Sequence, residues 1–437
     1  MFKRIPNNVL RLNLFCTTMK NFFNKFSTNK PSSQQFNELF TNEFDVDIEF
    51  FQNVKNQQRI LDNIRDREMI DNFPELFADN LDSKQLGNRL IEISRTLPND
   101  FHPIWNDRQH QTTIIDHIGQ QQNFDFKPLK AEDLLFEMNL AQFSSITRGK
   151  LGIVGGPRSY MFIEQLAELS RALARWTMAE LINKHGFTPV VTPNLIYSDF
   201  VRACGFEPFG ERTQVYTMDG RQNVCLAGTA EMPLASMNLG ENFATENDLP
   251  KLYCALSRCY RAEAKSSGEM SGLYRVHYFD KVEMFALTEP NDSDRMLDKF
   301  VSIEKSLFEQ LGLYFRIVDM PPNELGPAAY RKFDIETYMY GRDFWGEISS
   351  ASNCTDYQSK RLNITYQKFY FDSKTKAITE VRKNYVHTVN GTACAIPRII
   401  IAIVEQNQSK KQDYFIIPEC LRPFMKNDRI KMIKMNS

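Results

Sequence analysis

The sequence lacks the features that would assign it to a membrane, a disulfide scaffold or a repeat array. No stretch approaches the roughly 18 consecutive apolar residues that span a bilayer, so no membrane partner is predicted. No internal repeat is detectable. The cysteines form no Cys-X-X-Cys pair and have no histidine at metal-ligand spacing; they lie at positions 16, 204, 225, 254, 259, 354, 394 and 420. We therefore expect small buried thiols rather than disulfides or zinc ligands.

Acidic residues are absent from the first 37 positions, which carry six basic residues. These are Lys3, Arg4, Arg11, Lys20, Lys25 and Lys30, and the first acidic residue is Glu38. The composition is typical of a mitochondrial presequence, so residues 1–37 are predicted to direct the chain to the mitochondrial matrix. The alternative is a disordered basic tail that assists RNA binding. Removing the segment leaves 47 basic residues (53 minus 6) against 54 acidic ones, a net charge of −7.

The rest of the chain has an ordinary globular composition. The 437 residues are 42% hydrophobic and 24% charged, which is enough for one large core and a smaller domain. Segments rich in aromatic and β-branched residues alternate with helical ones such as residues 163–185. This pattern predicts an antiparallel β-sheet flanked by helices, of the α+β class.

The segment YRAEAKSSGEMSGLYRVHYFDKVEMF, residues 260–285, predicts a β-hairpin that can grip an anion. Its first strand ends near Glu263, a loop of serine and glycine follows, and the return strand is rich in aromatic and β-branched residues. Arg261, Arg275 and Lys281 can face a phosphate. The alternative is an ordinary hairpin whose charged residues lie on a solvated face.

Two further segments supply groups that the hairpin lacks. In GTAEMP, a turn places the hydroxyl of Thr229 beside the carboxylate of Glu231, and two acceptors together suit an ammonium group. In residues 389–408, a turn predicted at residues 390–392 leads into an apolar helix with Arg398 in its early part. A helix start and an arginine both favour anions. The alternative for this segment is a core helix whose arginine binds no ligand.

Taken in this order and spacing, the three segments resemble the class II aminoacyl-tRNA synthetases, and in detail the seryl-tRNA synthetases of mitochondrial type. A fourth segment, GEISSASNCTDYQSKRLNI (residues 346–364), looks like that family's strand of metal-binding groups. HGFTPVVTPNLIYSDFVRACGFEPFGERTQVY, with Pro193, looks like its dimer-forming first motif. The resemblance extends from about Gly152 to Pro423 and implies a class II antiparallel sheet flanked by helices.

The resemblance also implies a division into domains. Residues 38–130 would form a small helical tRNA-binding domain, residues 131–425 the class II catalytic domain, and residues 426–437 a basic tail. The family's long helical arm looks shortened here, because only 28 residues separate LDNIRDRE from LPNDFHP. One apolar pattern at heptad-like spacing, Leu86 to Leu97, allows a single short helix there.

The activity implied by the resemblance is ATP-dependent charging of serine tRNA with L-serine through a seryl-adenylate. Such chemistry depends on positioning and on charge stabilisation, so clamp residues are expected. Arg261 would bridge the α-phosphate and the serine carboxylate, while Arg275 and Arg398 would bind the outer phosphates; these are the implied catalytic residues. Glu347 and Ser350 would hold Mg²⁺ through oxygen ligands. The full implied ATP set is Arg261, Ala262, Glu263, Arg275, Val276, Phe279, Glu347, Ile348, Ser349, Ser350 and Arg398, in which Glu263 accepts from the adenine amino group and Phe279 stacks on the purine.

The serine site implied by the resemblance consists of small polar and acidic residues. It comprises Thr229, Ala230, Glu231, Arg261, Glu283 and Thr392. Thr229 and Glu231 would take the ammonium group, while Glu283 and Thr392 would receive the hydroxyl, whose absence from a wrong substrate leaves them unpaired. The alternative for Thr392 is a plain N-cap of the helix that follows.

The partners implied are serine tRNA, L-serine and a second copy of the chain; a heterodimer with a synthetase-like paralogue is the alternative. Arg65 and Arg67 in the N-terminal domain and the basic residues of 426–434 are candidate tRNA contacts, although solvated helix ends explain them equally well. A rival function is a weak or inactive synthetase-like paralogue that binds RNA or pairs with a true synthetase. Retention of the entire implied ATP and serine set argues against it.

Overall fold

The structure, a computed structural model, describes residues 48–77, 81–106, 111–144, 150–210, 213–263, 272–372 and 375–433. The predicted presequence, residues 1–37, the predicted hairpin loop at 264–271 and the last four residues of the predicted tail lie outside these ranges. Within them, no helix is both long and apolar enough to cross a bilayer.

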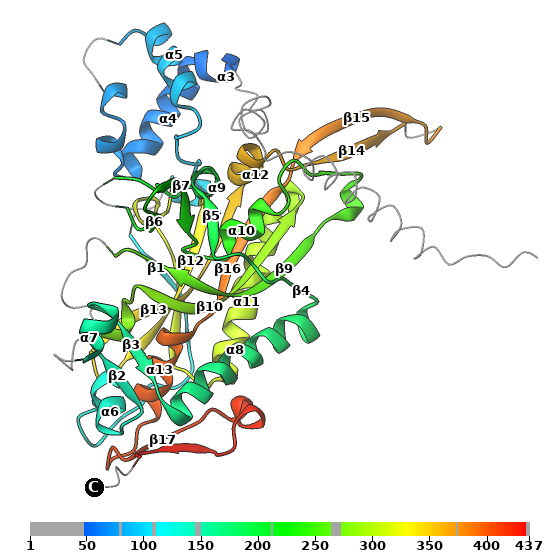
Figure 1. Cartoon of the computed structure of the whole chain (residues 1–437). Coiled ribbons are helices and arrows are strands. Elements are labelled where there is room, and N and C mark those ends of the chain that lie inside the picture. Colours follow the sequence, from blue (N-terminus) through cyan, green and yellow to red (C-terminus); the bar gives the residue numbers. More distant parts are fainter. Residues whose placement is uncertain are drawn as a thin grey trace, which may run out of the picture. The chain divides into compact units, whose positions relative to one another are not determined.

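An eight-stranded sheet with the order β1-β11-β12-β13-β16-β10-β9-β4 forms the centre of the fold (Figure 1). All neighbouring strands are antiparallel except β4 and β9, which are parallel. The strands are β1 (Thr113–Ile118), β4 (Thr188–Pro189), β9 (Lys251–Tyr260), β10 (Tyr278–Thr288), β11 (Phe315–Asp319), β12 (Arg331–Met339), β13 (Phe344–Thr355) and β16 (His387–Ala395). The predicted α+β class and the predicted hairpin, β9 with β10, are confirmed.

Alternation along β10 separates a core face from a polar face. Val282, Met284 and Ala286 belong to the main hydrophobic core, whereas Lys281 and Glu283 between them line a cavity on the other face. This is the period of two that a pleated strand imposes on its side chains. The sheet therefore carries the candidate site on one face and the core on the other.

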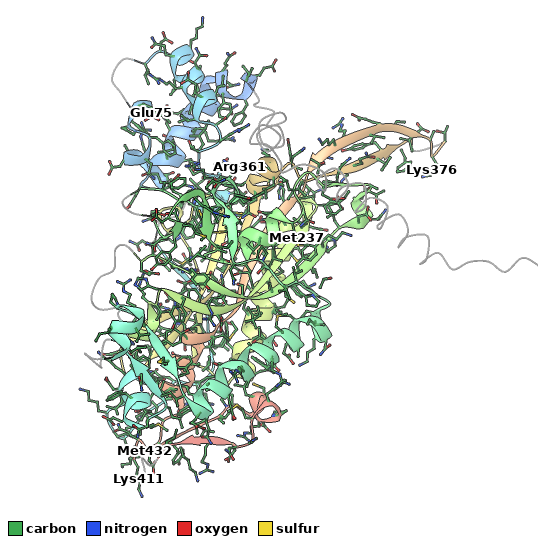
Figure 2. All side chains as sticks on the ribbon, viewed as in Figure 1. Glu75, Met237, Arg361, Lys376, Lys411 and Met432 are labelled. Atoms are coloured by element: carbon green, nitrogen blue, oxygen red, sulfur yellow. The ribbon has the colours of Figure 1, made fainter. Side chains whose placement is uncertain are left out.

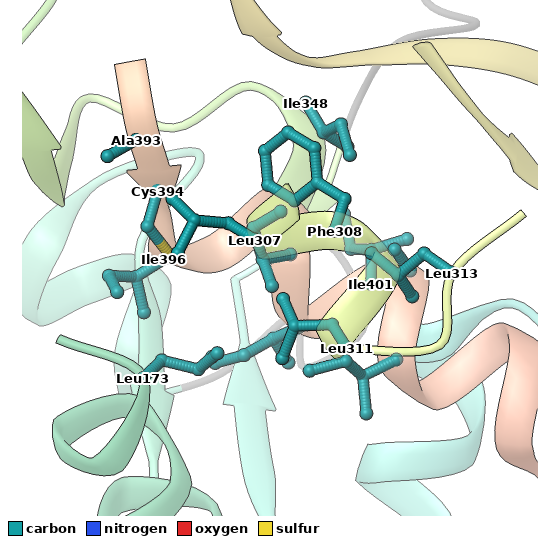
Figure 3. Packing of buried hydrophobic residues seen from close by; sticks show 14 of the residues in the cluster. Leu173, Leu307, Phe308, Leu311, Leu313, Ile348, Ala393, Cys394, Ile396 and Ile401 are labelled. Carbon is teal, nitrogen blue, oxygen red and sulfur yellow. The ribbon is translucent and has the colours of Figure 1, made fainter. Parts of the chain in front are cut away.

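Helices cover the core face of the sheet, where α8, α11 and α13 pack against the central strands (Figure 1). Figure 3 shows this packing, with Leu307 and Phe308 of α11 near Ile401 of α13 and Ile348 of β13. The described α-helices are α3 (Ile48–Gln52), α4 (Val54–Asp66), α5 (Ser83–Ile93), α6 (Ala131–Glu137), α7 (Lys150–Gly155), α8 (Glu164–His185), α9 (Ser198–Ala203), α10 (Glu231–Ser236), α11 (Ser293–Gln310), α12 (Tyr357–Leu362) and α13 (Ile396–Asn407). Gly186, with a φ of 72°, ends α8 in the left-handed conformation that favours glycine.

In the part of the chain that the structure describes, four smaller sheets accompany the central one. They are β2 (Ala141–Phe143) with β3 (Tyr160–Phe162); β5 (Leu195–Tyr197), β7 (Arg221–Leu226) and β6 (Thr217–Met218); β15 (Ile378–Tyr385), β14 (Thr365–Phe371) and β8 (Asn242–Phe243); and β17 (Tyr414–Ile416) with β18 (Arg429–Lys431). The β14–β15 hairpin extends away from the central sheet, and Lys376 marks its tip (Figures 1 and 2).

The turn predicted at residues 390–392 is wrong. These residues lie inside β16, where Asn390 pairs with Phe285 and Thr392 with Glu283. The N-cap alternative for Thr392 is wrong as well, because α13 begins at Ile396. Gly391 is required for space rather than for a turn: a Cβ there would lie 2.8 Å from an oxygen of Glu304.

The N-terminal helices α3 to α5 enclose their own apolar cluster. Its buried members are Ile64, Phe73, Leu76, Leu90 and Leu97. The predicted short helix is present as α5, which starts with a capping box between Asp82 and Gln85. Over residues 48–77 and 81–106 the longest helix is α4, with 13 residues, so no long helical arm exists in these ranges.

Arg67 joins this helical segment to the central sheet region and is not an RNA contact. Its side chain is 3% exposed, and its guanidinium donates to the carbonyl oxygens of Gly326 (3.1 Å), Asp100 (3.0 Å) and Ala329 (2.8 Å). Burial lowers the pKa of Arg67 to about 10. Its neighbour Arg65 is exposed and pairs with Asp62 at 2.7 Å. The tRNA hypothesis is therefore wrong for Arg67.

We predict that Arg67→Met lowers the free energy of unfolding by about 2–4 kcal/mol, because buried carbonyl oxygens lose a charged donor. Urea unfolding measures this, and limited proteolysis should show earlier cleavage within residues 48–106. The matched control is Arg65→Met, which breaks a surface ion pair and should change stability by less than about 1 kcal/mol. Equal effects of the two substitutions would contradict the anchoring role.

Candidate functional site

A cavity of about 370 Å³ opens on the polar face of the central sheet. Most of the residues implied by the sequence line it: Thr229, Glu231, Arg261, Glu263, Arg275, Val276, Phe279, Glu283, Glu347, Ile348, Ser349, Ser350, Thr392 and Arg398. The exceptions are Ala230, which is buried before α10, and Ala262, whose backbone nitrogen donates to Gln214 O at 2.8 Å. Segments separated by up to 170 residues thus meet in one place.

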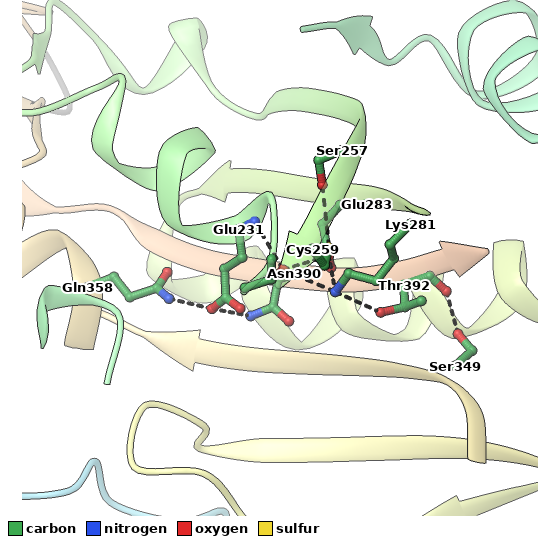
Figure 4. Close-up of polar contacts among 10 residues, drawn as sticks. Glu231, Ser257, Cys259, Lys281, Glu283, Ser349, Gln358, Asn390 and Thr392 are labelled. Atoms are coloured by element: carbon green, nitrogen blue, oxygen red, sulfur yellow. Dashed lines mark hydrogen bonds and ion pairs between the residues drawn. The ribbon is translucent and has the colours of Figure 1, made fainter. Parts of the chain in front are cut away.

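One end of the cavity is a buried polar pocket centred on Lys281 (Figure 4). The Nζ atom of Lys281 forms an ion pair with Glu283 and donates to the hydroxyl of Thr229 at 3.0 Å and of Thr392 at 3.4 Å. Thr229 in turn donates to Glu283 Oε2 at 2.8 Å. The pocket therefore holds one ion pair with two hydroxyl groups around it. Each of these groups can form a hydrogen bond with a small ligand.

Glu231 lies beside this pocket and is held by two amides. Gln358 Nε2 donates to Glu231 Oε1 at 2.6 Å and Asn390 Nδ2 donates to the same oxygen at 3.0 Å (Figure 4). Burial raises the pKa of Glu231 to about 7, and the negative charge of Glu283 contributes. A cation that entered the pocket would stabilise the ionised carboxylate.

Asn390 and Gln358 were not among the residues that the sequence implied for the site. Lys281 was expected to face a phosphate, but its Nζ atom is instead paired with Glu283 in the buried pocket. A signal for Lys281 exists: it lies two residues from both Phe279 and Glu283 on one strand, so all three share a face. Asn390 likewise lies two residues from Thr392 in β16. The mistaken turn at 390–392 hid that periodicity. Gln358, on α12, has no comparable signal.

Arginines line the opposite end of the cavity. Arg261 follows β9 directly; its backbone nitrogen donates to His277 O at 2.9 Å, and its guanidinium carbon lies 5.1 Å from the centre of the Phe279 ring. The Arg261 guanidinium makes no hydrogen bond or ion pair to any part of the chain that the structure describes. A half-buried cation without a partner is available to an anionic ligand.

Glu263 and Arg275 face each other across the same end. Arg275 donates to Glu263 Oε2 at 3.2 Å, and Arg158 donates to the Glu263 carbonyl oxygen at 3.1 Å. Glu263 has a φ of 50°, a left-handed conformation that is strained for this residue. Strained backbone of this kind is concentrated at ligand sites.

Arg398 and Glu347 form the third charged group. Arg398 donates to Glu347 O at 2.9 Å, pairs with Glu347 Oε2 at 3.3 Å and lies over the ring of Tyr274, with 4.4 Å from guanidinium carbon to ring centre. Partial burial would raise the pKa of Glu347, but the cations Arg398, Lys332 and Arg261 outweigh it and lower the pKa to about 2. Glu347 is therefore ionised throughout the physiological range.

The residues implied for Mg²⁺ are compatible with it as a pair of oxygen donors. Glu347 supplies an ionised carboxylate and Ser350 a hydroxyl on the same strand, β13, and both line the cavity. Magnesium is commonly held by one or two protein oxygens together with ligand phosphates. In the described ranges, no group of three or more His, Cys, Asp or Glu side chains could hold an ion without such help.

Comparison with known proteins identifies the family of the chain. A family model described as the tRNA synthetase class II core domain (G, H, P, S and T) matches residues 215–407. The serine–tRNA ligase of Treponema denticola is 37% identical over 346 residues, covering 78% of this chain and 78% of that protein. The mitochondrial serine–tRNA ligase of Saccharomyces cerevisiae is 36% identical, covering 80% and 76%.

The chain belongs to the seryl-tRNA synthetase family. The mitochondrial serine–tRNA ligase of Mus musculus is 38% identical over 351 residues, which are 79% of this chain and 64% of the mouse protein. The chain thus spans less than two thirds of the mouse relative. A solved seryl-tRNA synthetase from Pyrococcus horikoshii complexed with ATP superimposes with a TM-score of 0.70 at 27% identity, covering 89% of this chain and 90% of that one. The class II fold is confirmed.

A buried carboxyl, Glu304 of α11, lies behind the polar pocket. Glu304 is fully buried, and neither carboxyl oxygen forms a hydrogen bond within the described ranges. Burial raises the pKa of Glu304 well above its usual range, and the negative charges of Glu283 and Asp334 add to the effect. The raised pKa favours the neutral form of Glu304 in the folded protein, since an unpaired buried carboxylate is very costly.

The raised pKa of Glu304 predicts a pH-dependent stability difference. A carboxyl whose folded pKa exceeds its unfolded value stabilises the fold below the unfolded pKa of about 4.3, and that stabilisation is lost as the pH rises towards the folded pKa. Glu304→Gln removes this titration. The melting temperature of the variant relative to the parent should rise between pH 5 and pH 8. The control is Glu309→Gln on the exposed side of α11, and a flat difference for Glu304→Gln would refute the neutral state.

Proposed function

We propose that the protein charges serine tRNA with L-serine in an ATP-dependent reaction through a seryl-adenylate. The observation that carries the proposal is the cavity itself, whose lining combines three arginines, Arg261, Arg275 and Arg398, with a buried group of acids and hydroxyls. The arginines suit a nucleoside triphosphate, and the buried group suits a small hydroxylated amino acid. The names of the similar proteins support the same reaction.

In the first step a carboxylate oxygen of serine attacks the α-phosphorus of ATP, and the bond from that phosphorus to the pyrophosphate oxygen breaks. Arg261 supplies a planar fork that bridges the two anions, which otherwise repel each other. Arg275 and Arg398 take the outer phosphates. Because these cations are fixed before the ligand arrives, they stabilise the charge that develops without reorganising.

The adenine is placed by the same end of the cavity. Glu263 accepts from its amino group, with Ala262 and Val276 supplying neighbouring backbone, and the Phe279 ring stacks on the purine while Arg398 covers the second face. Mg²⁺, when bound through Glu347 and Ser350, would neutralise charge on the phosphate oxygens. Ile348 and Ser349 complete this wall of the cavity.

The amino acid is placed by the buried pocket. Glu231 and Thr229 accept hydrogen bonds from the serine ammonium group, with Ala230 between them, and Glu283 and Thr392 bond the serine hydroxyl. Lys281 holds Glu283 and both threonines in position. An amino acid without the hydroxyl would leave these buried groups unpaired, which is the physical basis of selection.

In the second step the terminal ribose hydroxyl of tRNA takes the seryl group and AMP leaves. We place this activity in the mitochondrial matrix, with residues 1–37 as the targeting segment, 38–130 as the tRNA-binding domain, 131–425 as the catalytic domain and 426–437 as a basic tail. The acting species is proposed to be a homodimer built on the motif around Pro193, with a heterodimer as the alternative. The rival is a weak or inactive synthetase-like paralogue that binds RNA or pairs with a true synthetase, and it predicts little or no serine-dependent ATP–pyrophosphate exchange in the test that follows.

We predict that Arg261→Ala lowers serine-dependent ATP–pyrophosphate exchange by about 10²–10³-fold, because the bridge between the reacting anions is lost. The matched control is Arg258→Ala in β9, three residues earlier, where the arginine is on the surface and pairs with Asp280; its exchange should match the parent. Parental exchange in Arg261→Ala would remove the central assignment. No exchange in the parent protein would favour the paralogue.

Thr392→Val separates the roles of the two ends. The loss of one hydroxyl in the buried pocket should raise the KM for serine by about 5–30-fold, the effect of a missing hydrogen bond of 1–2 kcal/mol. The KM for ATP should stay within about twofold. Thr388→Val in the same strand is the control, because that buried hydroxyl has no partner within the described chain. Equal losses for both ligands would count against the division.

A further inference from the structure

The β14–β15 hairpin exposes large apolar side chains that the fold does not use. Phe371 is 58% exposed, Ile378 57%, Val381 49% and Tyr370 37%. The strands pair only with each other along most of their length, since β8 reaches no further than Tyr366. A two-stranded hairpin has little stability by itself, and apolar side chains that stay in water do not stabilise it. The exposed set is therefore suited to a partner.

The net charge of the hairpin is positive, whereas that of the whole chain is negative. Residues 365–385 contain five basic residues and two acidic ones, a net charge of +3, whereas the full chain has a net charge of −1; the basic residues are at 368, 374, 376, 382 and 383, and the acidic ones at 372 and 380. Positive charge concentrated on an otherwise acidic protein is the electrostatic pattern expected of a nucleic-acid contact.

The strand register places aromatic and basic groups together. Lys368 pairs with Arg382, and Tyr370 with Glu380, so these four share one face. On this face the Arg382 guanidinium carbon lies 5.0 Å from the centre of the Tyr370 ring. Phe369 pairs with Val381 and Phe371 with Ile378 on the other face. One face thus offers the Tyr370 ring beside the ion pair of Arg382 with Glu380, and the other an apolar platform.

We propose that this hairpin binds RNA, with unpaired bases stacking on Tyr370 and Phe371 and phosphates close to Lys376 and Arg382. Aromatic rings beside cations bind exposed bases because every base has a π-face and every nucleotide a negative phosphate. An acidic protein partner could complement the charge and the apolar platform, but aromatic rings beside basic groups favour RNA, and the protein alternative is an outcome of the test below. The RNA is the tRNA substrate, so the inference rests on the proposed function.

The N-terminal helices α3 to α5 are short, so a second tRNA contact on the hairpin would add to binding. Over residues 48–77 and 81–106 the longest helix has 13 residues, about 20 Å at 1.5 Å per residue. Such a helix reaches only a small part of a tRNA. A second contact, on the β14–β15 hairpin near the C-terminal end of the sequence, increases the effective affinity for tRNA. It requires no change at the catalytic cavity.

The test compares the full-length protein with Tyr370→Ala plus Phe371→Ala and, separately, with Lys376→Glu. The probe is a fluorescently labelled transcript of a mitochondrial serine tRNA from the organism that encodes this protein. The protein is titrated into the probe at several salt concentrations, and binding is followed by fluorescence anisotropy. The aromatic double variant should bind about 10-fold more weakly or worse, the range for losing stacked bases. Lys376→Glu should reduce the slope of log affinity against log salt by about 1.

Lys411→Glu is the matched control, because Lys411 is an exposed lysine at the end of the molecule away from Lys376 (Figure 2). Its affinity and salt slope should match the parent. Serine-dependent ATP–pyrophosphate exchange needs no tRNA, so it should be unchanged in every hairpin variant. If the parent itself shows no exchange, the proposed function fails while the anisotropy still decides whether the hairpin binds RNA.

Three outcomes overturn the proposal. Parental tRNA affinity in both hairpin variants would show that the ribbon does not touch RNA. Exchange reduced in parallel with charging would show that the hairpin supports the catalytic domain instead. If sedimentation shows that the aromatic double variant differs from the parent in oligomeric mass while its tRNA affinity is retained, the apolar platform is a protein contact.

Discussion

The antiparallel pairing of β10 with β9 on one side and β16 on the other is the constraint on which the site depends. It places Glu283 opposite Thr392 in the register and sets Lys281 on the same face as Glu283. The ion pair between Lys281 and Glu283 is buried, so neither charge is tolerable without the other and without the threonine hydroxyls around them. A slip of one residue in this register would turn both charges into the apolar core and remove the pocket.

The two ends of the cavity obey different electrostatic rules. Around Glu347 the arginines and Lys332 dominate, and its carboxylate stays ionised with a pKa of about 2. Around Glu231 burial dominates, and the pKa rises to about 7. An end rich in fixed cations receives the phosphates, whereas the end of acids and hydroxyls gains most from an ammonium group. The distribution of charge along a single cavity therefore orients the two substrates towards each other.

Much of this arrangement was predictable from the sequence, because strand periodicity and short motifs are local. The hairpin, its arginines and the pairing of Thr229 with Glu231 in one short segment were all read from neighbouring residues, and the structure brings them to one cavity. The failures are non-local. Asn-Gly in residues 390–391 is a turn signal, yet both residues lie in β16. The glycine serves there because Glu304, 87 residues earlier, occupies the space of a Cβ. Arg67 reads as a surface cation, yet its partners are carbonyl groups 259 and 262 residues away.

The close approach of Gly391 and Glu304 has an evolutionary consequence. Any side chain at position 391 would collide with the carboxyl at 304, with the Phe300 ring at 3.0 Å as a further obstacle. A side chain at position 391 is therefore tolerable only where residue 304 is shorter or turned away. In relatives that carry alanine or a larger residue at the position of Gly391, the helix residue facing it should be smaller than glutamate or reoriented, so the two columns should vary together.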